Sequence, residues 1–393
     1  MVEKYRHLYV IVEFDEGMLL PVSKEMIGEA RRLMDKFNQK YSSKEKVVAI
    51  VLGHNIKNYA KELIEFGADT AIYCDNPELK DVRNNIYTKV ISQIAQDTKT
   101  LGEIEPEYAS EVKRPRYMFF AADSIGRHLS STTLADLESG LASDINQLVI
   151  EDIDLTHQQK TAGKKETYEK TLEMYRPDFS GFLWTTILCL DNRNPAFQRD
   201  YHPQSCSIIP GVFEPIEQDA SREGKIIEFV PTIDEQDLKV KVLSREVIQS
   251  EVDFDTPRTI VSFGRGIKDE PEQNIRLVEQ LAKELNAEIG VTLPISKKPF
   301  SVSQALDSKY MIPDRVIGTS GHKTSAMLYI AAGVSGAMQH VWGMKDSGFV
   351  VAINPDEGAP IKDECDIFIK GRMEDVIPLL IEEIKKQIQI VEA

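Results

Sequence analysis

Hydrophobic and polar positions follow two alternating patterns in the first third of the chain. Nearly continuous apolar runs predict strands covered on both faces, at residues 7–14, 46–53, 69–74 and 116–122. Between these runs, apolar residues recur with helical spacing and predict helices, at 23–37, 58–67 and 84–97. Strands and helices that alternate in this way predict a parallel sheet flanked by helices.

Between about residues 140 and 243 the helical spacing disappears. Short apolar segments with polar or turn-rich connections predict strands, at 147–153, 166–174, 182–190 and 224–233. We expect these strands to extend the first sheet in antiparallel pairing. Two polar stretches, 98–115 and 191–205, look like surface insertions.

A second series of strands and helices begins near Thr256. It predicts strands at 258–263, 288–293, 348–354 and 365–371, and helices at 271–287 and 374–388. The stretch 315–333 predicts a strand, a turn and a helix. The charged segment 244–257 separates the two series, so we expect an α/β protein of two domains, 1–252 and 253–393.

Composition agrees with a two-domain protein and narrows the class of partner. The chain has 393 residues and a formal net charge of -16, which disfavours nucleic acid because phosphates would be repelled. No apolar run approaches the roughly 20 residues that span a bilayer. The first 17 residues lack the pattern of a signal peptide, so we expect a cytoplasmic protein. The four cysteines form no Cys-x-x-Cys pair, which argues against a zinc or iron–sulfur module.

The sequence contains no motif for bond-making catalysis. A Gly-x-Ser-x-Gly elbow, a P-loop and a His-Glu-x-x-His helix are all missing, so we expect no catalytic residue and no metal site. Most of the glycine turns in the second domain directly follow a predicted strand, at Gly264-Arg265-Gly266, Gly318-Thr319-Ser320-Gly321 and Ser335-Gly336-Ala337. Ligands of doubly wound sheets bind at the carboxyl ends of the strands, where glycine backbone can approach them closely. Together these turns favour a dinucleotide site.

Three polar residues near these turns have structural explanations as well as functional ones. A lone histidine near a helix, such as His340, is typical of structural hydrogen bonding. Asn354 at a strand end is typical of a turn or a helix cap. Arg265 lies between two glycines, which suits a phosphate or a flavin, although an exposed salt bridge has the same pattern.

Longer segments resemble the alpha subunit of electron-transfer flavoproteins, in order and over nearly the whole chain. Two long segments of the second domain carry most of the resemblance: LYIAAGVSGAMQHVWGMKDSGFVVAINPDEGAPI and SFGRGIKDEPEQNIRLVEQLAKEL. Shorter ones in the first half are similar in order and spacing: IGEARRL, AIVLGH, ELIEFGAD, DSIGRHLSSTTLADLESGLASD and IIPGVFEP.

The resemblance implies a nucleotide-hydrolase-like (HUP-like) N-terminal domain and a Rossmann-like C-terminal domain that binds FAD. It implies a heterodimer with a beta subunit, and electron relay between an acyl-CoA or hydroxyacid dehydrogenase and a second redox partner, such as ferredoxin or a quinone reductase. The FAD contacts that it implies are Arg265, Thr292, Ile317, Gly318, Thr319, Ser320, Ser335, Gly336, Ala337, Met338, Gln339, His340, Asn354, Arg372 and Met373.

Several of these residues have implied roles. Ser320 would lie near the flavin N5, and His340 would face the N1/O2 edge, where a donor or positive charge stabilises the reduced flavin. The turn from Ser335 to Gln339 would cradle the phosphates. Asn354 would hold the adenosine end.

The chain departs from the family pattern at two places. Where the family has Gly-Ala-Ser-Arg, with the arginine over the flavin ring, this chain has Gly290-Val291-Thr292-Leu293, with Lys297 or Lys298 as possible substitutes. Where the family has Asp-Leu near the adenosine end, this chain has Arg372-Met373. These changes predict a shifted flavin potential or weaker retention of FAD.

Two alternatives stay open. The chain could belong to a flavin-based electron-bifurcating complex linked to NADH and ferredoxin. It could also be a structural subunit that holds AMP or an inert FAD.

Overall fold

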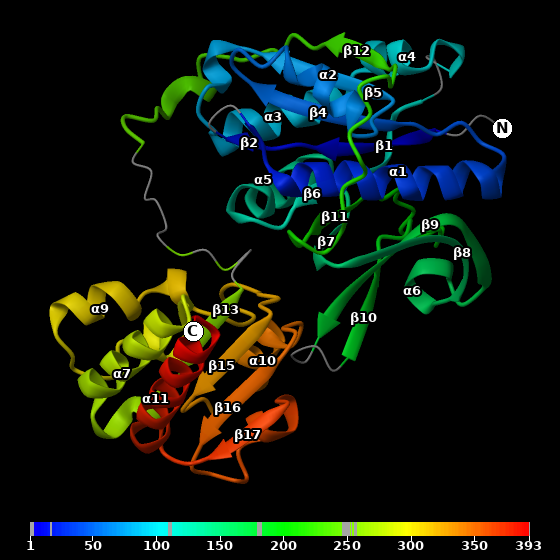
Figure 1. The fold of residues 1–393 in the computed structure, drawn as a ribbon. Helices are drawn as coiled ribbons and strands as arrows, with labels where there is room; N and C mark the ends of the chain where they lie inside the picture. The colour runs from blue at the N-terminus through cyan, green and yellow to red at the C-terminus, as the bar shows by residue number, and fades with distance from the viewer. Residues whose placement is uncertain are drawn as a thin grey trace. The chain divides into compact units, whose positions relative to one another are not determined.

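The computed structural model describes residues 4–15, 18–108, 112–178, 183–245, 252, 254 and 258–392. The described residues up to Arg245 form one compact unit, and those from Val252 onward form a second. Both units are α/β, as predicted (Figure 1). The domain boundary at residue 252 falls where most residues lie outside this description, and it stays a prediction.

The N-terminal unit is built on a seven-stranded sheet in which every neighbouring pair of strands is parallel. In spatial order the strands are β12 (Lys225–Glu228), β5 (Thr70–Asp75), β4 (Val47–Gly53), β1 (Tyr5–Ile11), β6 (Arg114–Ala121), β11 (Gln204–Ile208) and β7 (Leu141–Ile145). A short hairpin, β2 (Phe14–Asp15) and β3 (Met18–Leu19), follows β1. The predicted strands of the first third are confirmed, and every residue of β4 is buried because helices cover both faces.

Helices cover the two faces of this sheet and make two cores. The helices are α1 (Pro21–Tyr41), α2 (Tyr59–Glu65), α3 (Asn84–Gln96), α4 (Thr98–Ile104) and α5 (Ser124–Asp136). Alternate residues of β4 divide between them, since successive side chains of a strand point to opposite faces. Val47 packs in the core that contains α1 and α2, and Val48 packs in the core that contains α3, α4 and α5.

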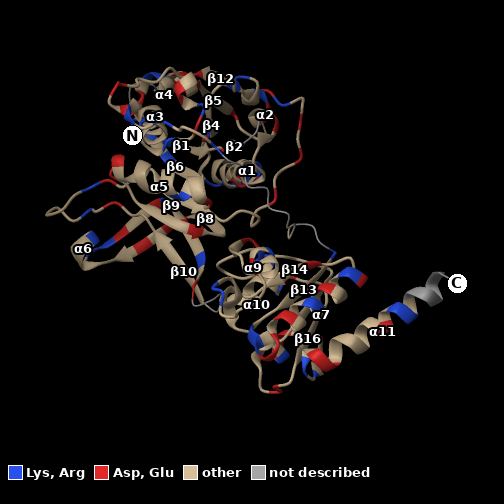
Figure 2. Cartoon of the chain, turned by 90° about the vertical axis from the view of Figure 1, so that its left-hand side faces the viewer, with Lys and Arg blue, Asp and Glu red and all other residues tan. Residues whose placement is uncertain are grey.

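The expected antiparallel extension of the first sheet is wrong. The antiparallel strands β8 (Gln147–Thr156), β9 (Lys165–Asp178) and β10 (Leu183–Leu188) form a separate three-stranded sheet in the order β10-β9-β8, with α6 (Gln158–Thr161) between β8 and β9. Figure 2 shows charged residues along β8 and β9, acidic in β8 and of both signs in β9, whereas β4 has none. One face of the small sheet still packs on the first core, through Leu148, Ile150, Leu172 and Met174. The last predicted strand, β12, does join the large sheet, but in parallel with β5.

The stretches predicted as surface insertions also contribute to the core. Residues 98–104 form α4, where Asp97 caps the helix by accepting hydrogen bonds from the backbone of Lys99 and Thr100. Leu101 and Ile104 lie on its buried side. These two apolar residues are three positions apart, which is a helical signal that the polar composition masked. Gln204 at the end of the second stretch begins the buried strand β11.

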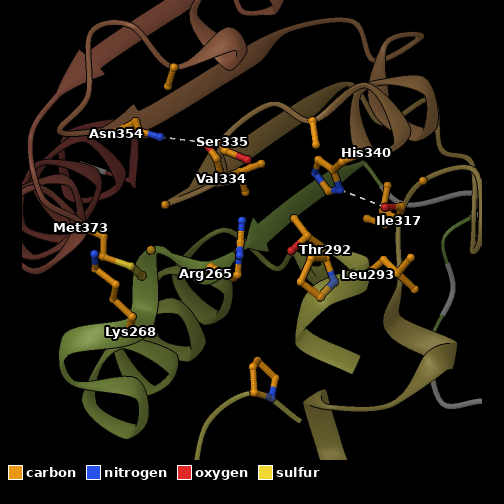
Figure 3. A pocket seen from close by; sticks show the side chains of 18 of the residues that line it. Arg265, Lys268, Thr292, Leu293, Ile317, Val334, Ser335, His340, Asn354 and Met373 are labelled. Carbon is orange, nitrogen blue, oxygen red and sulfur yellow. Dashed lines mark hydrogen bonds between the residues drawn. The ribbon is translucent and has the colours of Figure 1, made fainter. Parts of the chain in front are cut away.

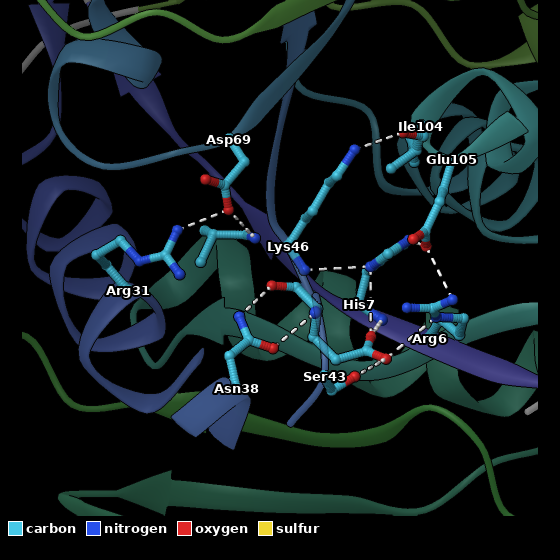
Figure 4. Close-up of polar contacts among 11 residues, drawn as sticks. Arg6, His7, Arg31, Asn38, Ser43, Lys46, Asp69, Ile104 and Glu105 are labelled. Atoms are coloured by element: carbon cyan, nitrogen blue, oxygen red, sulfur yellow. Dashed lines mark hydrogen bonds and ion pairs between the residues drawn. The ribbon is translucent and has the colours of Figure 1, made fainter. Parts of the chain in front are cut away.

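A buried cluster of charged residues closes the amino-terminal end of the large sheet (Figure 4). His7 has a positive φ of 68° and is left out of the pairing between β1 and β6, although the register is the same on both sides of it. Its Nδ1 lies 3.3 Å from Glu45 Oε2, its Nε2 lies 3.3 Å from Glu105 Oε2, and Arg6 forms ion pairs with both carboxylates. Burial alone would lower the pKa of His7, but the hydrogen bonds and charges of Glu105 and Glu45 outweigh it and raise the pKa. Burial would raise the pKa of Glu45, yet His7 lowers it to about 2.

The C-terminal unit has a five-stranded sheet that is parallel throughout. In spatial order its strands are β14 (Glu288–Val291), β13 (Thr259–Phe263), β15 (Leu328–Ala332), β16 (Val350–Asn354) and β17 (Ile367–Lys370). Its helices are α7 (Pro271–Glu284), α8 (Leu293–Ser296), α9 (Gln304–Tyr310), α10 (Met338–Met344) and α11 (Met373–Glu392). Figure 1 shows α7 and α11 side by side on one face, where their apolar residues share a core with β13.

The predicted helix within residues 315–333 is wrong. The structure has the buried strand β15 there, at the centre of the sheet. Its alanines favour a helix by intrinsic propensity, but pairing with β13 and β16 on both sides overrides that preference. Residues 316–322, predicted to begin with a strand, form a compact loop with only isolated bridges.

Candidate functional site

The strand order of the C-terminal sheet marks the candidate site. β13 comes first in the chain, with β14 on one side and β15 on the other, so the chain changes direction across the sheet at β13. A crevice forms at the carboxyl ends of strands at such a point, and ligands of doubly wound sheets bind there. A cavity of about 840 Å³ lies at these ends and is lined by the residues that follow β13, β14, β15, β16 and β17 (Figure 3).

The structure brings most of the predicted site residues together around this cavity. Those that line it are Arg265, Thr292, Ile317, Gly318, Thr319, Ser320, Ser335, Ala337, Gln339, His340, Asn354, Arg372 and Met373. Their contacts with a cofactor stay predictions.

Two predicted residues do not line the cavity. Gly336 has a φ of 82° and is packed so closely that a Cβ there would lie 2.1 Å from the backbone nitrogen of Ile361. Met338 is the first residue of α10, so the predicted turn from Ser335 to His340 is shorter than expected. Gly336 therefore shapes the turn through its close packing against Ile361 and not as part of the cavity wall.

Sequence reasoning missed the charged residues at one end of the cavity. Lys268 and Asp269 line it from the 3₁₀ turn η5 (Arg265–Asp269), and Glu374 lines it from the start of α11. Lys268 and Asp269 follow the Gly-Arg-Gly motif after a single residue, Ile267, so the motif could have identified them. Their turn lies close against the turn after β15, because a Cβ at Gly266 would come within 2.5 Å of the Gly333 Cα.

Arg265 supplies a cation that none of the described residues neutralises. Its guanidinium makes no hydrogen bond or ion pair with any residue that the structure describes, and its side chain projects into the middle of the cavity (Figure 3). Lys268 lies toward the end that also contains Met373. An exposed guanidinium between glycine turns is suited to bind phosphate oxygens in two parallel hydrogen bonds.

The opposite end of the cavity is apolar. It is formed by Leu293, Pro294, Pro299 and Phe300, which suits a flat aromatic ring. Lys297 and Lys298, the suggested substitutes for the family's arginine, are not among the lining residues. Lys298 instead forms an ion pair with Asp307, at 2.7 Å.

His340 uses both ring nitrogens inside the protein. Nδ1 lies 2.9 Å from the carbonyl oxygen of Ile317, and Nε2 lies 3.0 Å from the hydroxyl of Tyr329. A carbonyl only accepts, so Nδ1 carries the hydrogen and Nε2 of the neutral ring accepts from Tyr329. Burial lowers the pKa of His340 to about 4, against the opposing effect of the bond to Ile317. His340 thus holds the loop that begins at Ile317, and its predicted position at the flavin N1/O2 edge, as a donor or positive charge, stays a prediction.

Asn354 has a similar positioning role. Its side-chain nitrogen donates to the carbonyl of Val334 at 2.8 Å, and its side-chain oxygen accepts from the backbone of Asp356 at 2.9 Å. The amide thus ties the turn after β15 to the turn after β16. The predicted direct contact with an adenosine stays a prediction.

The cavity fits FAD in size and in the distribution of charge. Its glycine turns, unneutralised Arg265 and apolar end match a diphosphate joined to an aromatic ring system. Within the described ranges, no group of three or more His, Cys, Asp and Glu residues is arranged to hold a metal ion. A search of the same residues finds no helix with the length and apolar character needed to cross a membrane.

Comparison with known proteins agrees with this geometry. The family model described as electron transfer flavoprotein domain matches residues 8–177, and the electron transfer flavoprotein FAD-binding domain matches residues 253–345. The electron transfer flavoprotein subunit alpha of Thermoanaerobacterium thermosaccharolyticum is 34% identical, over 97% of this chain and 98% of its own. The acryloyl-CoA reductase electron transfer subunit beta of Anaerotignum propionicum is 31% identical, over 98% and 97%. The protein FixB of Clostridium saccharobutylicum is 32% identical, over 97% of each chain. The chain belongs to the electron transfer flavoprotein alpha-subunit family, and its cofactor is FAD.

Proposed function

We propose that this chain pairs with an electron transfer flavoprotein beta subunit and carries electrons from an acyl-CoA-type flavin dehydrogenase to a second redox protein. The cavity with Arg265 at its centre and an apolar end is the observation that carries the proposal. The name of the Anaerotignum propionicum relative, an electron transfer subunit of acryloyl-CoA reductase, supports a CoA-linked partner. FAD supplies the redox chemistry when bound, and no side chain of this protein is oxidised.

The chain's own residues bind and orient the cofactor in this proposal. Arg265 and Lys268 bind the diphosphate, and the close approach of Gly266 to Gly333 leaves the backbone beside it unobstructed. The apolar end receives the ring system and excludes water from one side of it. Neither Lys297 nor Lys298 is among the described residues that line the cavity, so we expect a lower reduction potential than an arginine at Leu293 would give.

The hydroxyl and amide groups of the wall complete the site. Thr319 and Ser320 are exposed to the cavity on a loop that His340 holds in place through Ile317. Their hydroxyls can donate to, or accept from, polar edges of the ring. Asn354 keeps the turns at the phosphate side together.

The test is to purify the chain with its co-expressed beta subunit and to record the absorption spectrum and flavin content. We expect a yellow complex that releases FAD on acid treatment and is reduced by an acyl-CoA substrate only when the dehydrogenase is added. A colourless complex would contradict the proposal. Rapid reduction by NADH together with ferredoxin would instead indicate a bifurcating complex. A flavin that no accessible potential reduces would indicate a structural subunit.

A further inference from the structure

A cluster of charged residues lies at the end of the cavity opposite Leu293. Arg372, just before α11, places Nη2 2.5 Å from Asp269 Oδ2 and 3.4 Å from Glu374 Oε1. All three residues line the cavity, and they come from two segments more than a hundred residues apart in the sequence. The guanidinium that interrupts the family pattern is therefore already paired with two carboxylates.

A buried residue of α7 fixes this cluster from behind. The side-chain nitrogen of Asn274 donates to Glu374 Oε1 at 2.9 Å, and Asn274 is completely buried. Burial would raise the pKa of Glu374, but the hydrogen bonds from Asn274 and Arg372 outweigh it and lower the pKa. Asn274, Glu374, Arg372 and Asp269 thus form a chain that leads from the core to the cavity.

Asp269 is the member of the cluster that keeps a free acceptor. Its Oδ2 is bound to Arg372, while its Oδ1 accepts no hydrogen bond from the part of the chain that the structure describes. Its side chain is 48% exposed. Asp269 also ends the same turn that begins with Arg265, and Gly266 fixes this turn by donating to the carbonyl of Gly333 at 2.9 Å. A ligand whose phosphate is bound at Arg265 would therefore meet a carboxylate four positions further along the turn.

The chemistry of the cluster favours a sugar diol over a further phosphate. In dinucleotide-binding folds a carboxylate binds the hydroxyls of the adenosine ribose, whereas a free arginine suits a 2′-phosphate. Arg372 is not free, because two carboxylates offset its charge. We propose that Asp269 binds the ribose hydroxyls of the adenosine half of FAD, and that Arg372 is a positioning residue that holds the Asp269 carboxylate. This inference rests on the proposed orientation of FAD in the cavity.

The test uses the purified complex after removal of its flavin, titrated separately with FAD, ADP and riboflavin 5′-phosphate. Hydrogen bonds to a charged group typically contribute enough to change affinity roughly tenfold to a hundredfold. We expect Asp269→Asn to weaken the binding of FAD and of ADP by about that factor and to leave the affinity for riboflavin 5′-phosphate unchanged. Arg372→Ala should cause a smaller loss of affinity for FAD and ADP. In a protein that already contains Arg372→Ala, the further change Asp269→Asn should reduce these affinities less than it does in the wild type.

A matched control is available on the same unit. Asp346 pairs with Lys323, is 46% exposed and does not line the cavity, so Asp346→Asn should change none of the three affinities. Wild-type affinity of Asp269→Asn for ADP would overturn the inference. So would an Arg372→Ala variant that loses more affinity than Asp269→Asn, together with tighter binding of 2′-phospho-ADP than of ADP. If the wild type binds ADP but not FAD, the proposed function fails, while the ADP titration still decides the role of Asp269.

Discussion

The two units each contain a buried histidine, and the pKa values of the two side chains are shifted in opposite directions. His7 is 1% exposed between Glu45 and Glu105, and its pKa is raised. His340 is 4% exposed between a carbonyl and the Tyr329 hydroxyl, and its pKa is lowered to about 4. Burial lowers the pKa at both sites, so the partners decide the direction of the net shift. Two carboxylates favour the charged form of His7, whereas the neutral partners of His340 leave burial to favour its uncharged form.

The two histidines differ in the same way in their roles, since His7 contributes to stability and His340 to the candidate site. The His7 cluster joins β1 to the segments that contain Glu45 and Glu105. The His340 pair orients a loop of the cavity wall without adding charge there. A buried histidine is thus informative only together with its partners.

The largest expected effect is loss of a carboxylate from the His7 cluster. Glu45→Ala leaves the cations of Arg6 and His7 buried with one partner fewer, so we expect the free energy of unfolding to fall by about 3–5 kcal/mol. Urea denaturation, monitored by circular dichroism, measures the free energy of unfolding. Glu151→Ala, which removes the exposed partner of Lys40, should change stability by less than about 1 kcal/mol. Equal losses in the two variants would mean that burial of the cluster adds nothing.

The second effect is a difference in pH dependence. The folded pKa of His340 is about 4 against an ordinary 6.5, so its contribution is complete above pH 6.5 and is lost as the pH falls toward 4, by about 3 kcal/mol. The raised pKa of His7 acts the other way: its contribution is complete below pH 6.5 and is lost as the pH rises through the folded pKa.

Unfolding free energies measured from pH 4 to 9 test this comparison. His340→Gln should flatten the curve between pH 4 and 6.5, and His7→Gln should flatten it above 6.5. The two tryptophans, Trp184 and Trp342, lie one in each unit, so Trp184→Phe makes fluorescence report on the C-terminal unit alone. Identical curves for the two glutamine variants would contradict the opposite pKa shifts of the two histidines.

The smallest effect concerns His340 and the cofactor. His340→Ala frees the carbonyl of Ile317, so the wall loop loosens, and we expect FAD to dissociate roughly tenfold faster, which corresponds to about 1.4 kcal/mol. Tyr329→Phe removes only the bond to Nε2 and should have less effect. Fluorescence of the released flavin measures both rates. A shift of the flavin potential in His340→Ala without faster release would support the direct flavin contact that the sequence predicted.

Much of the fold was predictable from the periodicity of apolar residues. Strands such as β4 and helices such as α1 can be predicted from short stretches of sequence, because their buried positions make apolar residues recur at a regular spacing. The separate sheet of β8, β9 and β10 could not be predicted in this way. Alternation of apolar and polar residues identifies a strand but does not indicate which strand it pairs with. β15 was missed because its pairing overrides the helical preference of its alanines.

The candidate site was predictable in position but only partly in chemistry. Glycine turns after strands indicate where a ligand approaches, and Arg265 was found in that way. The use of His340 depends on Tyr329 and Ile317, which are 11 and 23 positions away, so only the folded chain brings the three together. The pairing of Asp269 with Arg372 could not be predicted, because the two residues are 103 positions apart and only the folded chain brings them together.

Flavin content of a charge-reversed complex tests the central claim most directly. Arg265→Glu places a carboxylate where the proposed diphosphate lies, in a side chain that has no partner among the described residues to disturb. We predict that the purified complex loses one FAD for each copy of this chain, while its unfolding free energy differs from that of the flavin-free wild type by less than about 1 kcal/mol. Full flavin content in the Arg265→Glu complex would contradict the account.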